Sequence, residues 1–251
     1  MKNLSVFLFV SLIATSVFCQ VPELRVNSGH AKEIKSVEFS NDSRLILSAS
    51  SDNLIKLWDA ETGKEIRTLK GHSNIISCAK FSVDGKFIYS SSYDKTIRKW
   101  DAFSGSEISK MSTGIVPYSF CLTNDNKFLV TAEGNQINVW DLEKSKNVRT
   151  IKKKYACDYA LVTPDSKYIV SGGNDGIIRL WNFTNGDKEK EFSTGEYYIS
   201  SLDVSKDGSK IATITNDEIK VWDILSGKLL NSFERKEDRP KKAIFSPDGK
   251  S

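Results

Sequence analysis

Histidine is scarce in this sequence, whose 251 residues contain only His30 and His72. Each follows a glycine, and a tryptophan stands 28 residues after each of them. Two histidines that recur in one sequence context indicate structural positions, so no histidine remains for a Ser-His-Asp or Cys-His catalytic arrangement. None remains for an imidazole-ligated zinc or iron site either, and we expect no bound metal and no cofactor.

Cysteine is also rare, with four residues, of which Cys19 lies in an apolar N-terminal segment. The other three, Cys78, Cys121 and Cys157, form no C-x-x-C pair. Each lies in a strand predicted for a different unit of an internal repeat. Their odd number and strand positions favour buried free thiols that pack as small apolar side chains. A disulfide between neighbouring units is the alternative.

No glycine-rich phosphate loop is present. The glycine-rich run 172–176 falls between two predicted strands, so we interpret it as a hairpin turn. No pair of carboxylates stands out from the repeat, which disfavours a glycosidase-type site. The net charge is +4, with both signs mixed along the chain. We interpret the basic runs 152–154 and 235–242 as solvated connections and expect no nucleic-acid partner.

Only one stretch of the sequence is long and apolar, from residue 4 to residue 17. With the single positive charge before it, segment 1–19 is typical of a secretory signal peptide that is cleaved before Gln20. A membrane span needs about 20 apolar residues, so we expect none in the mature chain. The protein is therefore predicted to be secreted or periplasmic. An uncleaved signal anchor is one alternative; lipid attachment at Cys19 is another, against which the bulky Phe18 argues.

The stretch Leu45–Asp59 is predicted to form two strands joined by a tight turn. Leu45–Ala49 is apolar, Leu54–Trp58 alternates apolar and polar residues, and short polar side chains lie between them. This pattern recurs along the chain. Its tryptophans are separated by 42, 40, 41 and 41 residues, and an Asp or Asn follows each; they are Trp58, Trp100, Trp140, Trp181 and Trp222.

Repetition at this period, with Gly-His before and Trp-Asp after, resembles the WD-repeat β-propeller family over roughly residues 24–251. The resemblance implies an all-β fold in which four-stranded sheets, the blades, stack around a central channel. The predicted domain covers residues 20–251 behind the signal peptide 1–19. Five full blades are expected at about residues 34–69, 75–110, 115–151, 157–192 and 199–233.

Two further strands are predicted outside the full blades. Leu24–Val26 matches an outer strand without a blade of its own, and residues 241–251 match the start of a further blade. We therefore predict that the chain is the N-terminal fragment of a six- or seven-bladed ring. A closed five-bladed ring with loose ends is the alternative.

The family pattern implies a hydrogen-bonded set in each blade, made of the Gly-His histidine, a strand Ser or Thr, a turn Asp and the strand Trp. Hydroxyl and carboxylate partners would satisfy both nitrogens of a buried imidazole. The set is complete in two units: His30, Ser50, Asp52 and Trp58 in the first, and His72, Ser92, Asp94 and Trp100 in the second. The later units lack the histidine, so looser blades are expected there.

The resemblance implies that the chain is a docking platform for proteins, because loops on a rigid frame carry function. Exposed aromatic side chains at a rim suit a binding hot spot, although packing against neighbouring blades would also explain them. The predicted partner-binding residues are Tyr93, Tyr155, Tyr197, Asn74 and Asn174. The main hypothesis is an exported, non-catalytic scaffold for protein–protein interaction. The sequence names neither the partner nor the oligomeric state.

Two other functions are open. The propeller could be the targeting or regulatory part of a larger protein whose C-terminal part is an enzyme, for example a caspase-like peptidase. It could also be an enzyme with an active site in its channel. That function needs clustered His, Asp or Glu at the channel mouth, and no such cluster is recognisable in the sequence.

Overall fold

The computed structural model describes residues 29–215, 218–234 and 242–246. The predicted signal peptide, the predicted strand Leu24–Val26 and residues 247–251 lie outside the described residues. Twenty strands form five antiparallel four-stranded sheets, and the strands of each sheet follow one another in sequence order. This arrangement confirms the predicted all-β propeller of five four-stranded blades.

The strands have the following bounds. The first two blades comprise β1 (Ile34–Phe39), β2 (Leu45–Ser50), β3 (Ile55–Asp59) and β4 (Glu65–Leu69), then β5 (Ile76–Phe81), β6 (Phe87–Ser92), β7 (Thr96–Asp101) and β8 (Glu107–Ser112). The third and fourth comprise β9 (Ser119–Leu122), β10 (Phe128–Glu133), β11 (Gln136–Asp141) and β12 (Lys146–Lys152), then β13 (Cys157–Val162), β14 (Tyr168–Gly173), β15 (Ile177–Asn182) and β16 (Lys188–Ser193). The fifth comprises β17 (Ile199–Val204), β18 (Lys210–Thr215), β19 (Glu218–Asp223) and β20 (Leu229–Glu234).

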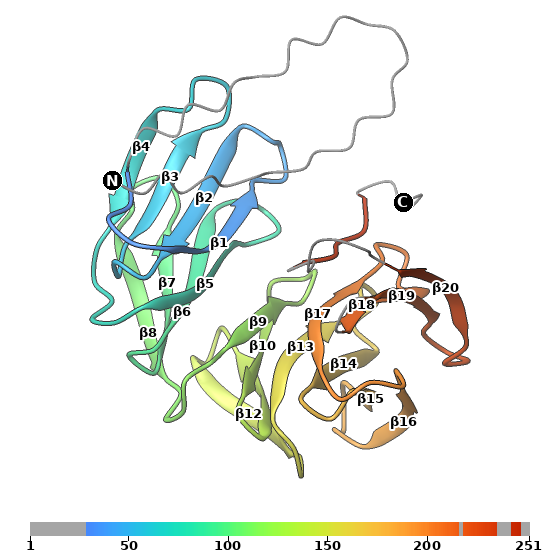
Figure 1. Ribbon diagram of the computed structural model, residues 1–251. Helices are drawn as coiled ribbons and strands as arrows, with labels where there is room; N and C mark the ends of the chain where they lie inside the picture. Colours follow the sequence, from blue (N-terminus) through green and yellow to red (C-terminus); the bar gives the residue numbers. More distant parts are fainter. Residues whose placement is uncertain (1–28, 216–217, 235–241, 247–251) are drawn as a thin grey trace, which may run out of the picture.

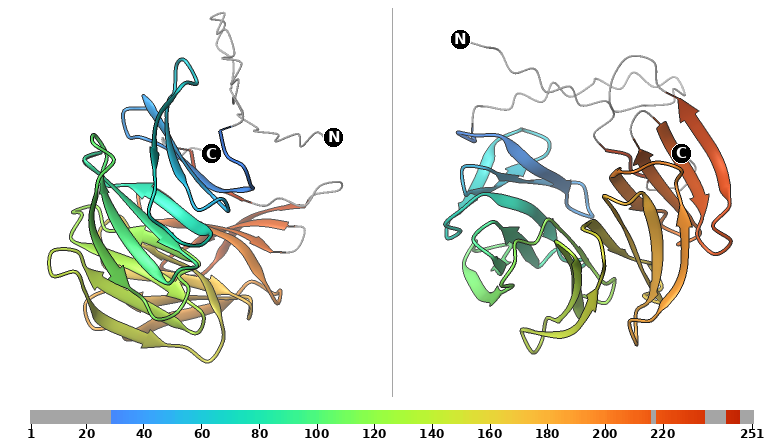
Figure 2. Two further views of the ribbon diagram at one scale, coloured as in Figure 1. Left: turned by 90° about the vertical axis from the view of Figure 1, so that its left-hand side faces the viewer. Right: turned by 60° about the horizontal axis from the view of Figure 1, so that its bottom comes forward.

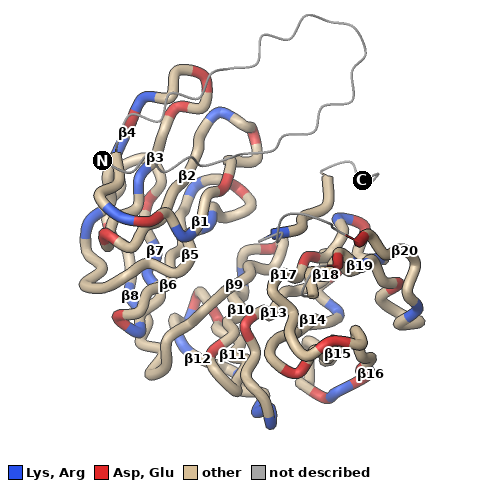
Figure 3. Tube along the Cα trace, in the orientation of Figure 1, with Lys and Arg blue, Asp and Glu red and all other residues tan. Residues whose placement is uncertain are grey.

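The blades follow one another around a common centre, with the first strand of each blade innermost (Figure 1; Figure 2, right). Neighbouring inner strands contact each other in the order β1, β5, β9, β13 and β17. Lys, Arg, Asp and Glu are distributed over all five blades rather than gathered on one (Figure 3). In the described part of the chain, no helix has the length and apolar character required to cross a membrane.

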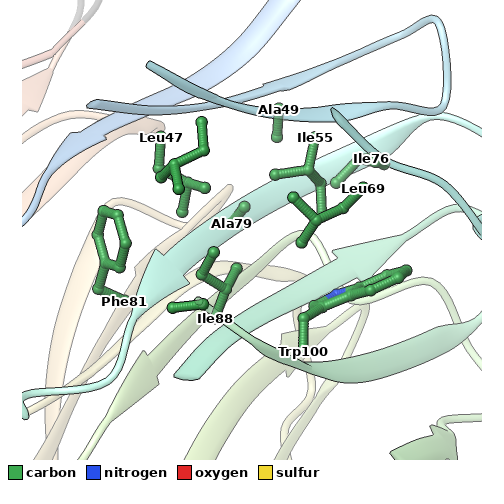
Figure 4. Packing of buried hydrophobic residues seen from close by; sticks show 11 residues of the cluster. Leu47, Ala49, Ile55, Leu69, Ile76, Ala79, Phe81, Ile88 and Trp100 are labelled. Carbon is green, nitrogen blue, oxygen red and sulfur yellow. The ribbon is translucent and has the colours of Figure 1, made fainter. Parts of the chain in front are cut away.

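The apolar cores lie between consecutive blades. Between the first and second blades, Leu47, Ile55 and Leu69 pack against Ile88 and Trp100 (Figure 4). Equivalent clusters join the second blade to the third, the third to the fourth and the fourth to the fifth. A single sheet of this size cannot bury both of its faces, so stacking is what removes these side chains from water.

Segment 242–246 lies beside the fifth blade. The Ala243 backbone N–H donates to Ser201 Oγ at 3.1 Å, as the Ala79 N–H donates to Ser36 Oγ at 3.0 Å between the first two blades. The segment therefore makes the contact with β17 that β5 makes with β1.

Candidate functional site

The second blade contains a continuous chain of side-chain hydrogen bonds. His72 Nδ1 lies 2.8 Å from Asp94 Oδ2, and His72 Nε2 lies 2.7 Å from Ser90 Oγ. The same Ser90 oxygen accepts the indole N–H of Trp100 at 2.8 Å. In the first blade, His30, Asp52 and Trp58 meet through Ser48 in the same geometry. The glycine before His30 makes room for this arrangement, because a Cβ there would lie 2.1 Å from the Trp58 ring.

The predicted serines of these sets were wrong. Ser50 and Ser92 are buried, but their hydroxyls donate to the backbone carbonyls of Lys32 and Asn74. Each hydroxyl also accepts the backbone N–H of the turn aspartate two residues later. The histidine and the tryptophan bond instead to the serines two residues earlier. Residues two apart in a strand point to the same face, so Ser90 and Ser92 both point towards the side of the sheet where His72 lies. How far the imidazole reaches along the strand decides which of the two hydroxyls it meets.

The carboxylate of Asp94 stays ionised at low pH. Burial acts to raise its pKa, but hydrogen bonds from Thr96 and His72 outweigh burial and hold the pKa at about 2. Burial lowers the pKa of His72, against the opposite influence of Asp94. A neutral imidazole between a carboxylate and a hydroxyl is therefore the favoured form, and its role is structural.

The third blade has no histidine, and Glu133, the last residue of β10, joins its hydrogen-bonded set instead. This side chain is fully buried and accepts the hydroxyl of Thr131, which in turn accepts the Trp140 indole N–H at 3.0 Å. Burial raises the pKa of the Glu133 carboxyl, and its Oε2 has no hydrogen-bond partner among the described residues. A protonated carboxyl thus suits this pocket better than an ionised one.

In the fourth blade, Lys153 takes the place of the histidine, since it lies 28 residues before Trp181 as His72 lies 28 residues before Trp100. Its Nζ lies 3.4 Å from Ser171 Oγ, the acceptor of the Trp181 indole N–H. Only 8% of Lys153 is exposed, so the prediction of a solvated loop over residues 152–154 was wrong at this position. In the fifth blade the Trp222 indole donates to Thr213 at 2.9 Å.

A row of exposed tyrosines marks one rim of the propeller. Tyr93 lies in the β6–β7 turn, Tyr155 before β13 and Tyr197 before β17; their exposed fractions are 40%, 47% and 88%. Asn74 and Asn174 are exposed on the same rim. The first two strands of a blade are antiparallel, so the start of the first strand and the turn after the second lie at the same end of the blade. In the second blade, Ile76 at the start of β5 pairs with Ser92 at the end of β6.

Two further tyrosines lie on this rim. Tyr118 packs edge to face against Tyr93 with ring centroids 6.4 Å apart, and Tyr198 is exposed beside Tyr197. We name Tyr93, Tyr118, Tyr155, Tyr197 and Tyr198 the tyrosine rim. All five tryptophans, by contrast, are buried, and four of them, from Trp100 onwards, lie in the apolar clusters between blades.

The channel brings together charged side chains that the repeat pattern did not reveal. Lys80 interacts electrostatically with Glu38 of the first blade and Asp203 of the fifth. Burial acts to lower the pKa of Lys80, but Cys121, Cys78 and the two acids outweigh it and raise the pKa. A cavity of about 160 Å³ opens beside Glu38, Lys80 and Cys121.

The two channel carboxylates already have structural partners. Glu38 accepts the Phe81 backbone N–H at 2.7 Å, and Asp203 accepts the Phe245 backbone N–H at 2.8 Å. Glu38 thus joins β1 to β5, and Asp203 joins β17 to segment 242–246. Burial raises the pKa of both carboxyls, against Lys80 and these backbone donors. This engagement favours a structural role over acid–base chemistry.

The three described cysteines are free thiols, and no disulfide joins neighbouring blades in the described residues. Cys157 is buried, whereas Cys78 and Cys121 are only half-buried. Burial raises the pKa of the Cys78 and Cys157 thiols. Within the described ranges, no group of three or more His, Cys, Asp or Glu side chains is arranged to hold a metal ion.

Stacked four-stranded blades, cores between them and a Trp–hydroxyl pair in every blade define a β-propeller built from sequence repeats. The WD domain, G-beta repeat family matches residues 22–59, 63–101 and 146–182. The chain belongs to the WD-repeat β-propeller family.

Three curated proteins are similar to this chain. The chain is 26% identical over 222 residues to the guanine nucleotide-binding protein subunit beta of Saccharomyces cerevisiae, covering 83% of this chain and 52% of that protein. It is 24% identical over 242 residues to apoptotic protease-activating factor 1 of Rattus norvegicus, covering 91% and 19%. It is 27% identical over 117 residues to protein groucho of Drosophila melanogaster, covering 45% and 16%. The chain therefore spans about half or less of the length of these relatives.

Proposed function

We propose that this chain is an exported, non-catalytic scaffold that binds a protein partner through the tyrosine rim. The observation that carries the proposal is the exposure of five tyrosines on one rim, while every tryptophan and His72 are buried in the frame. Tyrosine presents a large apolar area with few rotatable bonds, and aromatic residues of this kind dominate binding hot spots. WD-repeat relatives typically act as interaction scaffolds, which supports the same function.

A binding experiment with matched variants tests this proposal. The mature chain is immobilised, and the proteins retained from an extract of its source are compared between wild type and variants. Tyr93→Ala is expected to weaken retention of a specific partner, and the combined change of Tyr93, Tyr155 and Tyr197 to Ala is expected to abolish it. Phe103→Ala is the control, because Phe103 is 90% exposed in the β7–β8 turn, away from this rim. Partner retention by the triple variant would contradict this choice of surface.

Export is the second part of the proposal and has its own test. Segment 1–19 has the length, charge and apolar core of a signal peptide. We expect the protein outside the cytoplasm with Gln20 as its first residue, as N-terminal sequencing of the fractionated protein would show. An intact Met1 in the exported fraction would indicate an uncleaved anchor instead.

A second candidate function is that this propeller is the targeting part of a larger protein with an enzymatic portion. The small share of the relatives' length that the chain covers favours it. The coding sequence downstream of Ser251 tests this candidate directly.

A further inference from the structure

Lysines without acidic partners accompany the tyrosine rim from the β4–β5 connection to the β14–β15 turn. Among the described residues of these connections and the strand ends beside them, every exposed charged side chain is a lysine; they are Lys70, Lys95, Lys152 and Lys154. No ion pair reaches any of the four within the described part of the chain. Exposed acids at this end of the blades lie elsewhere on the ring, at Glu33, which binds Lys35 at 2.7 Å, and at Glu234 in the fifth blade.

The lysines of the opposite rim are arranged differently. Lys127 Nζ lies 3.8 Å from Asp125 Oδ2 in the β9–β10 turn, and both side chains are exposed. Lys167 Nζ likewise lies 3.3 Å from Asp165 Oδ2 in the β13–β14 turn. Exposed pairs of this kind add little stability, but each acid compensates the charge of its lysine at the surface. Uncompensated exposed lysines are therefore a property of the tyrosine rim.

The half-buried acids near these tyrosines do not neutralise the exposed lysines, because each acid has a cation of its own. The pairs are Asp94 with Arg98 at 3.5 Å, Asp175 with Arg179 at 2.6 Å, and Asp158 with Lys153, which interacts with it electrostatically. All three of these cations are largely removed from solvent, whereas the four exposed lysines face it. The surface between the tyrosines is thus positively charged.

Lys95 occupies a turn position whose backbone conformation suits glycine or asparagine. Its φ is 63°, and the residues in the equivalent turns of the first and fourth blades are Asn53 at 68° and Gly176 at 63°. The three positions are equivalent because each N–H donates to the carbonyl three residues earlier. A lysine there costs conformational energy, and its Nζ makes no hydrogen bond or ion pair in the described residues. Such a cost without an internal return is typical of residues that serve a binding site.

Two of the exposed lysines lie close to tyrosines of the rim. Lys154 Nζ lies 5.1 Å from the centroid of the Tyr155 ring. Lys95 follows Tyr93 by two residues in the same turn, and the Tyr93 ring packs against Tyr118 with centroids 6.4 Å apart. Ammonium groups and rings thus alternate from the second blade to the fourth. A segment with both acidic and apolar side chains can meet the ammonium groups and cover the rings.

We propose that the partner presents a short acidic segment to the tyrosine rim, with its carboxylates at Lys95 and Lys154. This inference rests on the proposed function, because it specifies the chemistry of a partner that binds the tyrosine rim. Apolar side chains of the segment cover the tyrosine rings and supply most of the affinity, while the opposite charges speed the encounter and fix the register. A basic segment would meet only like charge on this part of the rim.

A displayed library of random peptides of about 12 residues tests this inference on the mature chain. Selected peptides are expected to be rich in Asp and Glu. Combining Lys95→Gln with Lys154→Gln should weaken their binding at least tenfold, since glutamine removes the charge and keeps most of the side-chain length. Replacing the acidic residues of a selected peptide by Asn and Gln should weaken its binding to wild type by a similar factor. Combining Lys127→Gln with Lys167→Gln, which removes the same charge from the opposite rim, should leave affinity within twofold.

The outcomes separate the two proposals. Peptides that need the tyrosine rim but lack acidic residues, or that bind the two double-lysine variants equally, would overturn the inference and leave the proposed function intact. Displacement of the peptide by an equimolar single-stranded DNA of about 20 nucleotides in about 0.15 M salt would do the same, because the rim would then select charge alone.

Peptides that bind the triple tyrosine variant as tightly as wild type would overturn both proposals. A failure to select any peptide would overturn the inference, which requires a short linear segment. Thermal unfolding of each variant at the wild-type temperature shows that a lost affinity is not a lost fold.

Discussion

Leu69 and Phe233 occupy the same position in the outer strands of the first and fifth blades, yet only one of them is covered. Leu69 pairs with Ile55 and Phe233 pairs with Ile219 in the same register. The exposed fraction is 2% for Leu69, which packs against the second blade, and 54% for Phe233. The difference shows that burial in this fold comes from the next blade and not from the blade itself.

Leu69→Ala should therefore destabilise the protein far more than Phe233→Ala. Removing a large buried aliphatic side chain costs about 2–5 kcal/mol, whereas changes at exposed positions usually stay within about 0.5 kcal/mol. Urea unfolding followed by tryptophan fluorescence measures both values. A cost for Phe233→Ala as large as that for Leu69→Ala would show that the fifth blade's outer face is covered in solution.

Ser90→Ala should cost more stability than Ser92→Ala. The first change leaves both the His72 imidazole and the Trp100 indole without their shared partner inside the blade, a loss of about 1–3 kcal/mol. The second removes a hydroxyl that bonds only to the backbone. The two serines are equally buried, so the comparison is matched for size and depth. A larger cost for Ser92→Ala would instead support the hydrogen-bonded set expected from the sequence, in which Ser92 is the partner of His72 and Trp100.

Acid should destabilise the protein in two steps through the second blade. The pKa of His72 is lowered from its ordinary 6.5, so the unfolded state takes up this proton first and stability falls as the pH drops below about 6.5. The pKa of Asp94 is about 2 against an ordinary 3.8, so its stabilisation is present above about pH 4 and is lost as the pH falls towards 2. Urea unfolding at pH 7, 5 and 3 measures both steps.

Asp94→Asn isolates the second step. It should lower stability at pH 7 by about 1–3 kcal/mol and flatten the loss between pH 4 and pH 2. Glu61→Gln, in an exposed position, serves as the control. An unchanged acid profile in Asp94→Asn would mean that other carboxylates govern the acid limb.

Glu133→Gln should stabilise the protein at alkaline pH. Burial raises the pKa of Glu133, so its charged form opposes folding, and stability is lost as the pH rises from about 4.5 through the raised value. A neutral amide removes this loss and keeps an acceptor for the Thr131 hydroxyl. The melting temperature of the variant should exceed that of wild type at pH 8, and the gap should shrink towards pH 4. A lower melting temperature at pH 8 would mean that the ionised carboxylate is the favoured form.

Signals for several site residues are present in the sequence but could not be interpreted without coordinates. Lys153 stands 28 residues before Trp181, as His72 does before Trp100, and Glu133 is a charged residue at the end of a largely apolar strand. Glu38, Lys80 and Asp203 occupy equivalent positions in the inner strands of their respective blades. A repeat phase says which residues are equivalent, but it does not say which equivalent positions from different blades face each other across the ring.

The periodic tryptophans and the alternation within each strand were enough to predict the five blades, because both follow from local backbone geometry and from the need to bury one sheet against the next. Which serine meets the imidazole, which acids surround Lys80 and which tyrosine packs against Tyr93 were decided only in three dimensions. These relationships join side chains from different strands and blades, and their distances depend on how far each side chain reaches across the interface rather than on its place in the repeat.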